Sequence, residues 1–351
     1  MPDNAERVTV CQPWAATLLK TGLLISVLAA GCTDRPTLGA QWEVEYFDTI
    51  LTDIAEIGTD VWITGRCSGL FRHADDHFSQ VPVMVTGVAV GLSQLAACPN
   101  GTAWGIGGGQ PFHFDGSHWT NLDNLHGLQS IRCTDDEHVW AATSRTIVTY
   151  DRGIWRYVWI ADALEWGRLR ALWGSRASPN RIWAVGDERS LRIDGEHVER
   201  IEPLKGRFLS HVLGREHPDH TTELYASAGN HEVWRRSESD TKEAWTQVTA
   251  QRPLLFVNDG IWSADGAMLQ RREGEQVFRD EGLLVNPQRW NRRVDALLLD
   301  QEGWLWAIGS DRDAKAPLGV ECNAWETCPP CGAEFHRSFV ARRRYNLGQP
   351  F

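Results

Sequence analysis

The sequence lacks an excess of positive charge. Its 46 Asp and Glu residues outnumber its 35 Lys and Arg residues, which gives a net charge of −11 at pH 7. Proteins that bind nucleic acids neutralise phosphates with lysine and arginine, so we expect no nucleic-acid partner. The length of 351 residues suggests about two domains, although closed all-β architectures of this size are often one domain.

Long apolar runs are also missing at the N-terminus. The stretch TGLLISVLAAGC at 21–32 has an apolar part of about eleven residues, whereas a helix needs about 20 to span a bilayer. This length, behind Arg7 and Lys20, fits the h-region of a signal peptide. The small residues before Cys32 resemble the lipobox of bacterial lipoproteins, in which that cysteine carries the lipid. A plain secretory signal is the alternative.

The lipoprotein resemblance implies a location. Thr33 follows the cysteine where an aspartate would retain the protein in the inner membrane. We therefore expect an exported protein that is anchored through the lipid on Cys32, in the outer membrane of a two-membrane bacterium.

A helical periodicity is absent too. Apolar runs are short, β-branched and interrupted by glycine, and none repeats every 3.6 residues over two turns. The sequence has instead 18 tryptophans. Several occur in one short pattern, found in RIWAVGD at 181–187, DVWITGR at 60–66, TAWGIGG at 102–108 and WLWAIGS at 304–310.

Aligned on its aromatic residue, the pattern occurs seven times. These anchors are 36 to 44 residues apart and are Trp62, Trp104, Trp140, Trp183, Tyr225, Trp262 and Trp306. Such a period is typical of a β-propeller blade of four strands. Asp-Gly at 115–116 and at 194–195 predicts two-residue turns between the last two strands of two blades. We therefore predict an all-β, seven-bladed β-propeller whose anchors fill the space between blades.

The ring has to be closed, because otherwise two sheet edges remain open. QWEVEYF at 41–47 has the pattern of a fourth strand, and its Trp42 lies 20 residues before Trp62. The last unit has three strands but no fourth, so we predict that 41–47 completes the seventh blade. The expected organisation is a signal peptide at 1–31, a tether at 32–40, a propeller at 41–342 with a Cys-rich insertion at 313–332, and a tail at 343–351.

Six cysteines remain after the signal peptide and Cys32 are set aside, and export favours disulfides. Cys98 and Cys133 occupy equivalent places at the ends of first strands in neighbouring blades, so we predict that they pair. Two further disulfides are expected on the opposite face, with open connectivity, among Cys67, Cys322, Cys328 and Cys331. A four-thiolate zinc site and a redox CPPC motif are the alternatives for these four.

Signatures of catalysis are missing. No Gly-x-Ser-x-Gly elbow and no Ser/His/Asp set is visible. The glycine-rich GIGGGQ at 105–110 precedes a strand, whereas a phosphate cradle precedes a helix. The histidines His113, His118 and His126 do not have the spacing of metal ligands. We expect no catalytic residue, no metal and no cofactor.

The turns that follow the second strands should converge on one rim above the central channel, where propellers usually bind partners. These turns supply our candidate binding residues: Arg66, Gln110, Arg145, Asp187, Glu188, Arg189, Asn230, His231, Asp265, Asp311 and Arg312.

The segment DVWITGRCSGLFRHADDHFSQV at 60–81 resembles the propeller repeat of bacterial two-component regulators, as do 138–155 and 181–198. The resemblance covers about 40–342 and implies the propeller fold. In that family such repeats sense ligands beside a signalling helix and a kinase, and neither follows here.

We expect a non-catalytic, monomeric, lipid-anchored envelope propeller that binds a protein or a glycan through its rim. One alternative is a scaffold of envelope assembly, similar to the propeller lipoprotein of the outer-membrane barrel-assembly machine. Another is a hydrolase or lyase with its site at the central channel.

Overall fold

The computed structural model describes residues 42–345, apart from gaps at 48, 66–68, 123–124, 163–166, 218, 220, 229–231, 238–244, 249–252, 258–259, 266–267, 274–275, 281–291 and 316–335. In this part of the chain, no helix is long and apolar enough to cross a membrane. The expected signal peptide, Cys32, the tether, the C-terminal tail beyond 345 and the cysteines Cys67, Cys322, Cys328 and Cys331 lie outside the described residues.

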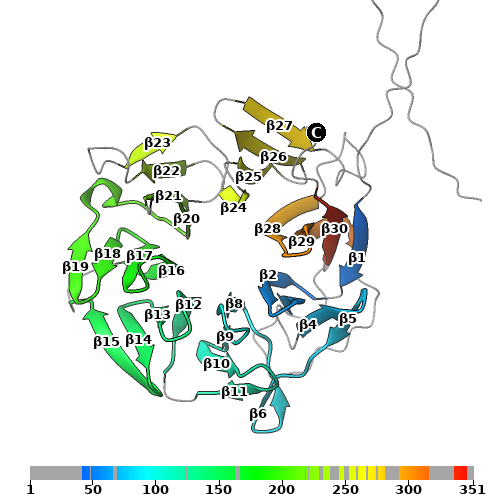
Figure 1. The fold of residues 1–351 in the computed structure, drawn as a ribbon, viewed down its shortest axis with the longest axis horizontal. Coiled ribbons are helices and arrows are strands. Elements are labelled where there is room, and N and C mark those ends of the chain that lie inside the picture. The colour runs from blue at the N-terminus through cyan, green and yellow to red at the C-terminus, as the bar shows by residue number, and fades with distance from the viewer. Residues whose placement is uncertain are drawn as a thin grey trace, which may run out of the picture. The chain divides into compact units, whose positions relative to one another are not determined.

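Seven four-stranded antiparallel sheets are arranged around a common centre (Figure 1). This confirms the predicted seven-bladed propeller. The strands of each blade follow one another from the centre outward. Blades one to three consist of β2 (Leu51–Ile57), β3 (Asp60–Gly65), β4 (Gly69–Ala74) and β5 (His77–Gln80); of β8 (Gln94–Ala97), β9 (Ala103–Gly107), β10 (Gln110–Phe114) and β11 (Trp119–Asn121); and of β12 (Leu128–Cys133), β13 (Val139–Thr143), β14 (Thr146–Asp151) and β15 (Ile154–Ile160).

Blades four to seven consist of β16 (Leu169–Gly174), β17 (Arg181–Gly186), β18 (Ser190–Asp194) and β19 (His197–Arg200); of β20 (His211–Glu216), β21 (Thr222–Ala228), β22 (Glu232–Ser237) and β23 (Thr246–Val248); of β24 (Pro253–Val257), β25 (Gly260–Asp265), β26 (Met268–Glu273) and β27 (Gln276–Asp280); and of β28 (Arg292–Leu299), β29 (Trp304–Lys315), β30 (His336–Arg344) and β1 (Glu43–Phe47).

Closure of the ring occurs as predicted. β1 pairs antiparallel with β30, in a register that runs from Glu43 opposite Arg342 to Phe47 opposite Ser338. In Figure 1 the blue β1 lies beside the red β30 as the outer strand of blade seven. The start of the propeller is thus joined to its end by main-chain hydrogen bonds.

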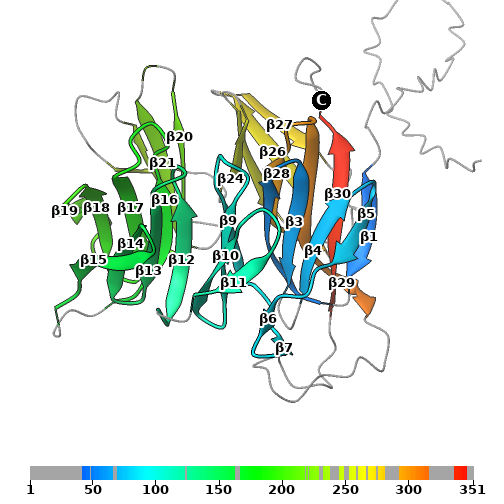
Figure 2. The same ribbon diagram turned by 60° about the horizontal axis from the view of Figure 1, so that its bottom comes forward.

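Two faces follow from the meander of each blade (Figure 2). Because the strands alternate in direction, the turns between second and third strands and the connections between blades lie on one face, which we call the rim face. The turns between first and second strands and between third and fourth strands lie on the other, which we call the opposite face. A hairpin of β6 (Met84–Val85) and β7 (Val88–Ala89) and a 3-10 turn (Glu202–Leu204) belong to two of the blade connections.

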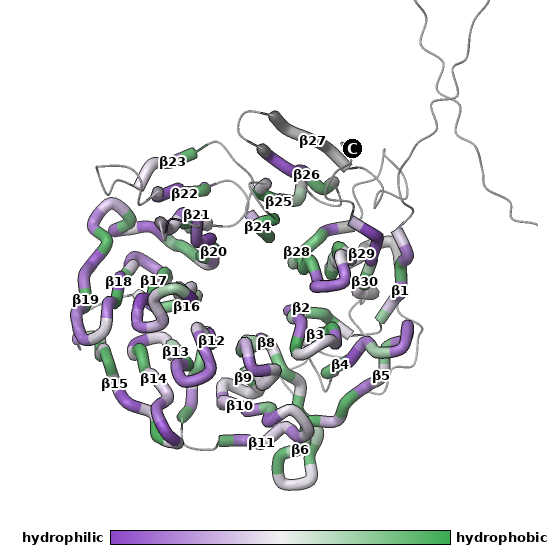
Figure 3. Tube along the Cα trace, in the orientation of Figure 1, coloured by the Kyte–Doolittle hydropathy of each residue, from purple (hydrophilic) through white to green (hydrophobic). Residues whose placement is uncertain are grey.

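All seven anchor residues are buried, with exposed fractions between 0% and 7%. The six tryptophan anchors belong to apolar clusters between adjacent blades, and Trp62, for example, packs with Leu95 and Phe112 of blade two. The seventh anchor, Tyr225, instead contacts the ring of Phe256 in blade six. Hydrophobic and hydrophilic stretches alternate along each blade (Figure 3), as expected for sheets that pack face to face. The anchors therefore serve the packing between blades.

A glycine follows several anchors by three residues for a steric reason. A Cβ on Gly186 would lie 1.8 Å from the carbonyl oxygen of Arg168, and a Cβ on Gly309 would lie 1.9 Å from that of Arg293. Here the second strand approaches the start of the inner strand more closely than any side chain allows. The Trp-x-x-Gly pattern thus encodes both the packing between blades and the close approach of the first two strands.

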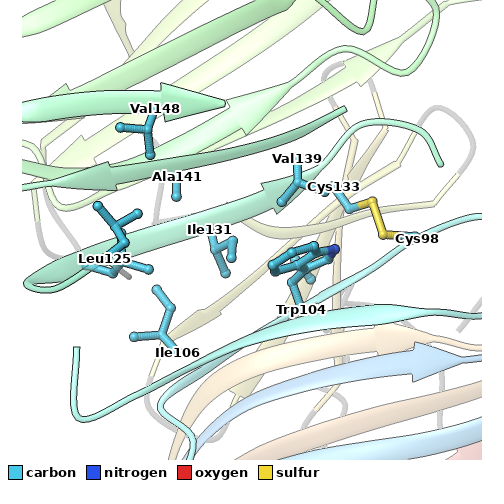
Figure 4. Close-up of a cluster of buried hydrophobic side chains, with 11 residues drawn as sticks. Cys98, Trp104, Ile106, Leu125, Ile131, Cys133, Val139, Ala141 and Val148 are labelled. Carbon is cyan, nitrogen blue, oxygen red and sulfur yellow. A yellow bond between two sulfur atoms is a disulfide. The ribbon is translucent and has the colours of Figure 1, made fainter. Parts of the chain in front are cut away.

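The predicted pairing of Cys98 with Cys133 is confirmed, with the two Cα atoms 5.3 Å apart. The disulfide joins the ends of the inner strands of blades two and three, beside Trp104 and Val139 (Figure 4).

The two Asp-Gly predictions need correction. Phe114 pairs with Trp119, so the first turn has four residues, because the Asp115 carboxylate accepts hydrogen bonds from the backbone of Ser117 and His118, each at 2.8 Å. These bonds lower the pKa of Asp115 to about 2. In the second turn Asp194 itself pairs with His197, so the two-residue turn starts one position later than predicted.

Candidate functional site

The candidate rim residues are only partly gathered in one place. Arg66, Asn230 and His231 lie outside the described residues, and Gln110 lies in β10. Asp265, Asp311 and Arg312 belong to strands rather than to turns, because β25 ends at Asp265 and β29 continues to Lys315. The structure gathers Arg145 and Asp187–Arg189 on the rim face of blades three and four.

Asp187 is held by a paired contact. The Arg170 guanidinium donates from Nε and Nη2 to the two carboxylate oxygens of Asp187, at 2.5 and 2.9 Å. The next residue, Glu188, has a φ of 59° and donates its backbone N–H to the Arg207 carbonyl at 2.7 Å. The turn at 187–188 is therefore fixed from both sides, and Phe208 beside it is 61% exposed.

Arg145, on the turn between β13 and β14, lies near Arg189, on the turn between β17 and β18. Arg189 is buried to 7% exposure and stacks over Trp159, with its Cζ 5.0 Å from the ring centroid. Burial, together with the positive charge of Arg145, lowers the pKa of Arg189, whereas Asp162 acts in the opposite direction. Arg145 donates to the carbonyl oxygen of Asp162 at 2.8 Å.

Gln110 belongs to a separate group on blade two. Its amide contacts the His126 ring at 3.2 Å and accepts a hydrogen bond from Asn121 at 2.9 Å. The described rim candidates therefore use their polar groups in contacts that order their own turns. Few of these groups are left to bind a ligand.

Polar side chains of the inner strands link blades one to four in a ladder. Inner strands leave N–H groups on one edge without a strand partner. Asp53 of blade one accepts from the Leu95 N–H of blade two at 2.9 Å, and Gln94 of blade two accepts from the Ile131 N–H of blade three at 3.0 Å. In the same way, Ser130 of blade three accepts from Leu172 of blade four at 3.1 Å.

The three ladder residues share one position, two residues before the partner of the anchor. Asp53 precedes Ala55, which pairs with Trp62, and the equivalent relation holds in blades two and three. The blade-four equivalent is Ala171, which has no side-chain acceptor. Sequence reasoning missed this ladder, although the repeat alignment contains its signal as a polar residue at a fixed place.

Asp53 is the one ladder residue that titrates. Burial raises the pKa of its carboxyl to about 6, while the N–H groups of Leu95 and Ile54 and the positive charge of Arg132 act in the opposite direction. Both carboxylate oxygens accept backbone hydrogen bonds, which suits a structural link.

We predict a pH effect of Asp53 on stability. The pKa of Asp53 is higher in the folded protein than in the unfolded chain, so the native state binds the proton more tightly. The contribution of Asp53 to the unfolding free energy therefore decreases as the pH rises from 4 to 6. The slope approaches about 1.4 kcal/mol per pH unit. Urea unfolding of the wild type and of Asp53→Asn over this range should give curves that differ by this slope. Parallel curves would contradict the assignment.

A groove lies on the opposite face, across blades two to four. Its volume is about 1030 Å³, and it is bordered by turn residues at 100–102, 136–138, 151–152 and 195–196. These turns come from three consecutive blades. None of the candidate rim residues belongs to these turns, since the turns lie on the other face.

Aromatic rings form one wall of the groove. Trp104 lies 4.7 Å from both the His113 and the Tyr150 ring centroids. Burial lowers the pKa of His113 and thereby favours its neutral ring, whereas Asp115 acts in the opposite direction. Charge is supplied by Asp151, which pairs with Arg156 at 3.2 Å. The groove thus combines apolar contact area with a few fixed polar groups, as ligand sites usually do.

The strand β15 adds a free sheet edge to this groove. It has seven residues and is the longest outer strand, and in the described part of the chain no strand pairs with its outer edge. Its residues Ile154, Tyr157 and Ile160 are 61%, 62% and 61% exposed. Arg156 is its one charged residue. Natural proteins usually shorten, charge or cover such edges, so an uncovered one marks a surface available for pairing.

No group of three or more side chains suited to a metal ion is found among the described residues. The zinc alternative concerns cysteines outside them.

Comparisons with known proteins concern the fold. No protein-family model matches the chain, and no curated protein matches it either. Among solved structures, YCF48 bound to the D1 peptide is similar with a TM-score of 0.61 at 15% identity, over 87% of this chain and 97% of that one. A virginiamycin B lyase from Staphylococcus aureus, catalytically inactive and with quinupristin, is similar with a TM-score of 0.55 at 13% identity, over 86% and 99%.

The extracellular domain of the hybrid two-component system BT4673 from B. thetaiotaomicron is also similar. Its TM-score is 0.59 at 12% identity, and the match covers 88% of this chain but 44% of that one, so this chain spans less than half its length. At these identities the likeness shows the propeller fold alone, and propellers of two-component regulators, which the repeat at 60–81 resembles, share that fold.

Proposed function

We propose that this protein is a non-catalytic binding module that holds an extended segment of a partner protein. The observation that carries the proposal is the groove on blades two to four, with its aromatic wall beside the free edge of β15. An extended peptide can add a strand to a sheet edge through main-chain hydrogen bonds, while pockets take alternate side chains. YCF48, a similar structure, is bound to a peptide.

A protein segment fits this surface better than a glycan. A glycan could stack on aromatic rings, but it cannot continue the backbone ladder that β15 leaves open. The exposed Ile154 and Ile160 at the edge also favour an apolar or mixed peptide side chain over a sugar.

We further propose that the protein works outside the cytoplasm, anchored through lipid on Cys32 in the outer membrane. The Cys98–Cys133 disulfide supports export, because disulfides persist in oxidising compartments. An envelope-assembly scaffold differs from this proposal in the identity of the partner alone. A channel enzyme has less support, since the Asp53 carboxyl, whose pKa of about 6 would suit acid–base chemistry, is already engaged by two backbone N–H groups.

The test is selection from a random peptide library displayed on phage. Peptides enriched on the wild type should bind Tyr157→Ala at least about tenfold more weakly, because exposed tyrosines at the centre of an interface often dominate its affinity. Affinity is measured by fluorescence polarisation with the synthetic peptide.

Phe208→Ala is the matched control. Phe208 is exposed to nearly the same extent as Tyr157, at 61% against 62%, but lies on the rim face. Retained binding by this variant supports the groove. Loss of binding with Phe208→Ala and retention with Tyr157→Ala would move the site to the predicted rim and overturn the groove assignment, as would enrichment of no peptide.

A further inference from the structure

Arg132 is a charged residue on an inner strand that makes no hydrogen bond or ion pair with any residue that the structure describes. Its Nε is buried and without a partner. A guanidinium offers five donors, and a buried donor without an acceptor costs about 1–3 kcal/mol. The fold therefore keeps an arginine on the inner strand β12 whose buried Nε has no acceptor among the described residues.

The side chain of Arg132 extends along blade four. A Cβ added to Gly174, the last residue of β16, would lie 3.7 Å from Arg132 Cγ. Two residues later, Arg176 lies on the turn of blade four on the opposite face. Arg176 is exposed and likewise makes no hydrogen bond or ion pair among the described side chains. Two arginines with free donors thus lie near each other in a chain of net charge −11.

The electrostatics agree with this placement. Burial is the main factor that lowers the pKa of Arg132, and the positive charge of Arg176 lowers it further, whereas Asp53 acts in the opposite direction. Asp53 forms no ion pair with Arg132 and directs its oxygens at the backbone of Leu95 and Ile54. Positive charge is therefore undercompensated at this point.

One carboxylate that contacts the turn of Arg176 is bound to the turn itself. Glu216 of blade five accepts from the Ala177 N–H at 3.0 and 3.1 Å and from the Ser175 hydroxyl. These bonds fix the residues on both sides of Arg176, and Glu216 forms no ion pair with Arg176. The backbone of the turn is thus held in place, while the Arg176 guanidinium remains available to bind a ligand.

We propose that Arg132 and Arg176 form a binding site for a small oxyanion, a phosphate or a carboxylate, where the inner strands of blades three and four meet the opposite face. Guanidinium groups bind both anions through paired, charge-assisted hydrogen bonds. The ligand supplies the negative charge and the acceptors that the surrounding protein lacks. The site is separate from the groove, which neither arginine lines.

The test uses the full chain and inorganic phosphate at constant ionic strength, with acetate and sodium chloride as parallel arms. Thermal unfolding should show saturable stabilisation of the wild type by phosphate, by acetate or by both, but not by chloride. The two oxyanion arms identify the preferred class. Isothermal titration with the stabilising anion then gives its affinity.

Arg132→Met keeps the apolar stem beside Gly174 and removes the charge, so it should weaken the affinity at least about tenfold. Arg176→Met lies on an exposed turn, where folding does not depend on it, and should also weaken the affinity. The control is Arg168→Met: Arg168 is an exposed arginine just before β16, at the other end of the strand that Arg176 follows. Its variant should bind as the wild type does.

An absence of saturable stabilisation in the wild type would overturn the proposal. So would equal affinities of the wild type and Arg176→Met, which tests the site even if Arg132→Met does not fold. Equal weakening by Arg168→Met would show a general effect of charge and would also contradict the site.

Discussion

Deletion of residues 41–47 should lower the melting temperature by about 10 °C or more. The deletion removes β1, the outer strand of blade seven, and with it the ladder to β30. It also removes Phe47, which is 8% exposed and packs edge-on against Phe71 and Phe78 of blade one, at 4.9 and 5.3 Å. Loss of a buried phenylalanine side chain alone costs about 3–5 kcal/mol.

Two point variants in β1 separate the contributions. Phe47→Ala keeps the strand and should lose an intermediate part of the stability, while Glu45→Ala, at an exposed position, should lose almost none. Differential scanning calorimetry of the three variants gives the comparison. A deletion variant that melts with the wild type would refute closure by this strand.

Replacement of Glu223 by alanine should cost about 3–5 kcal/mol of unfolding free energy. Its carboxylate is 3% exposed and accepts from Arg215 and Arg235, each at 2.7 Å, and from the Tyr225 hydroxyl at 3.0 Å. Without the Glu223 carboxylate, the guanidinium groups of Arg215 and Arg235 lose their counter-ion in a half-buried place.

Tyr225, which donates to Glu223, is the one anchor of the seven that is not tryptophan, and its ring lies 5.7 Å from Phe256 of blade six.

The same residue should affect the pH dependence. Burial favours the neutral carboxyl, but Arg215 and Arg235 outweigh it and hold the pKa of Glu223 below its usual range. Its stabilising contribution is therefore complete above pH 4.5 and decreases as the pH falls through the folded pKa. Urea unfolding should show a steeper loss for the wild type than for Glu223→Gln in this acid range.

The control for Glu223→Ala is Asp194→Ala. Asp194 pairs with Arg181 at 3.1 Å, but its side chain is 44% exposed. An exposed pair contributes about 0.2–1 kcal/mol, so this variant should lose far less stability. Similar losses in the two variants would mean that burial does not govern the effect of Glu223.

The architecture of the ring could be predicted from the sequence because it depends on a repeated local pattern. The spacing of the anchors counts the blades, and the missing fourth strand of the last unit identifies 41–47 as its complement. Cys98 and Cys133 could be paired because equivalent positions in adjacent blades are adjacent in space.

The surfaces could not be predicted in the same way. The groove depends on how far individual turns of three blades project, and the repeat alignment does not contain that information. The turn at Asp115 has four residues instead of the predicted two, because the Asp115 carboxylate accepts hydrogen bonds from the backbone N–H groups of Ser117 and His118. Sites of this kind depend on the departures from the repeat, whereas the fold depends on what the repeats share.

The ladder of Asp53, Gln94 and Ser130 also has a consequence for cooperativity. Each rung couples one blade to the next in a single rotational direction, and the disulfide adds a covalent coupling between blades two and three. In a chain of nearest-neighbour units, stronger coupling enlarges the segment that opens as one. Blades one to four should thus exchange their amide protons as a single block, and Ala171 marks the boundary where that block ends.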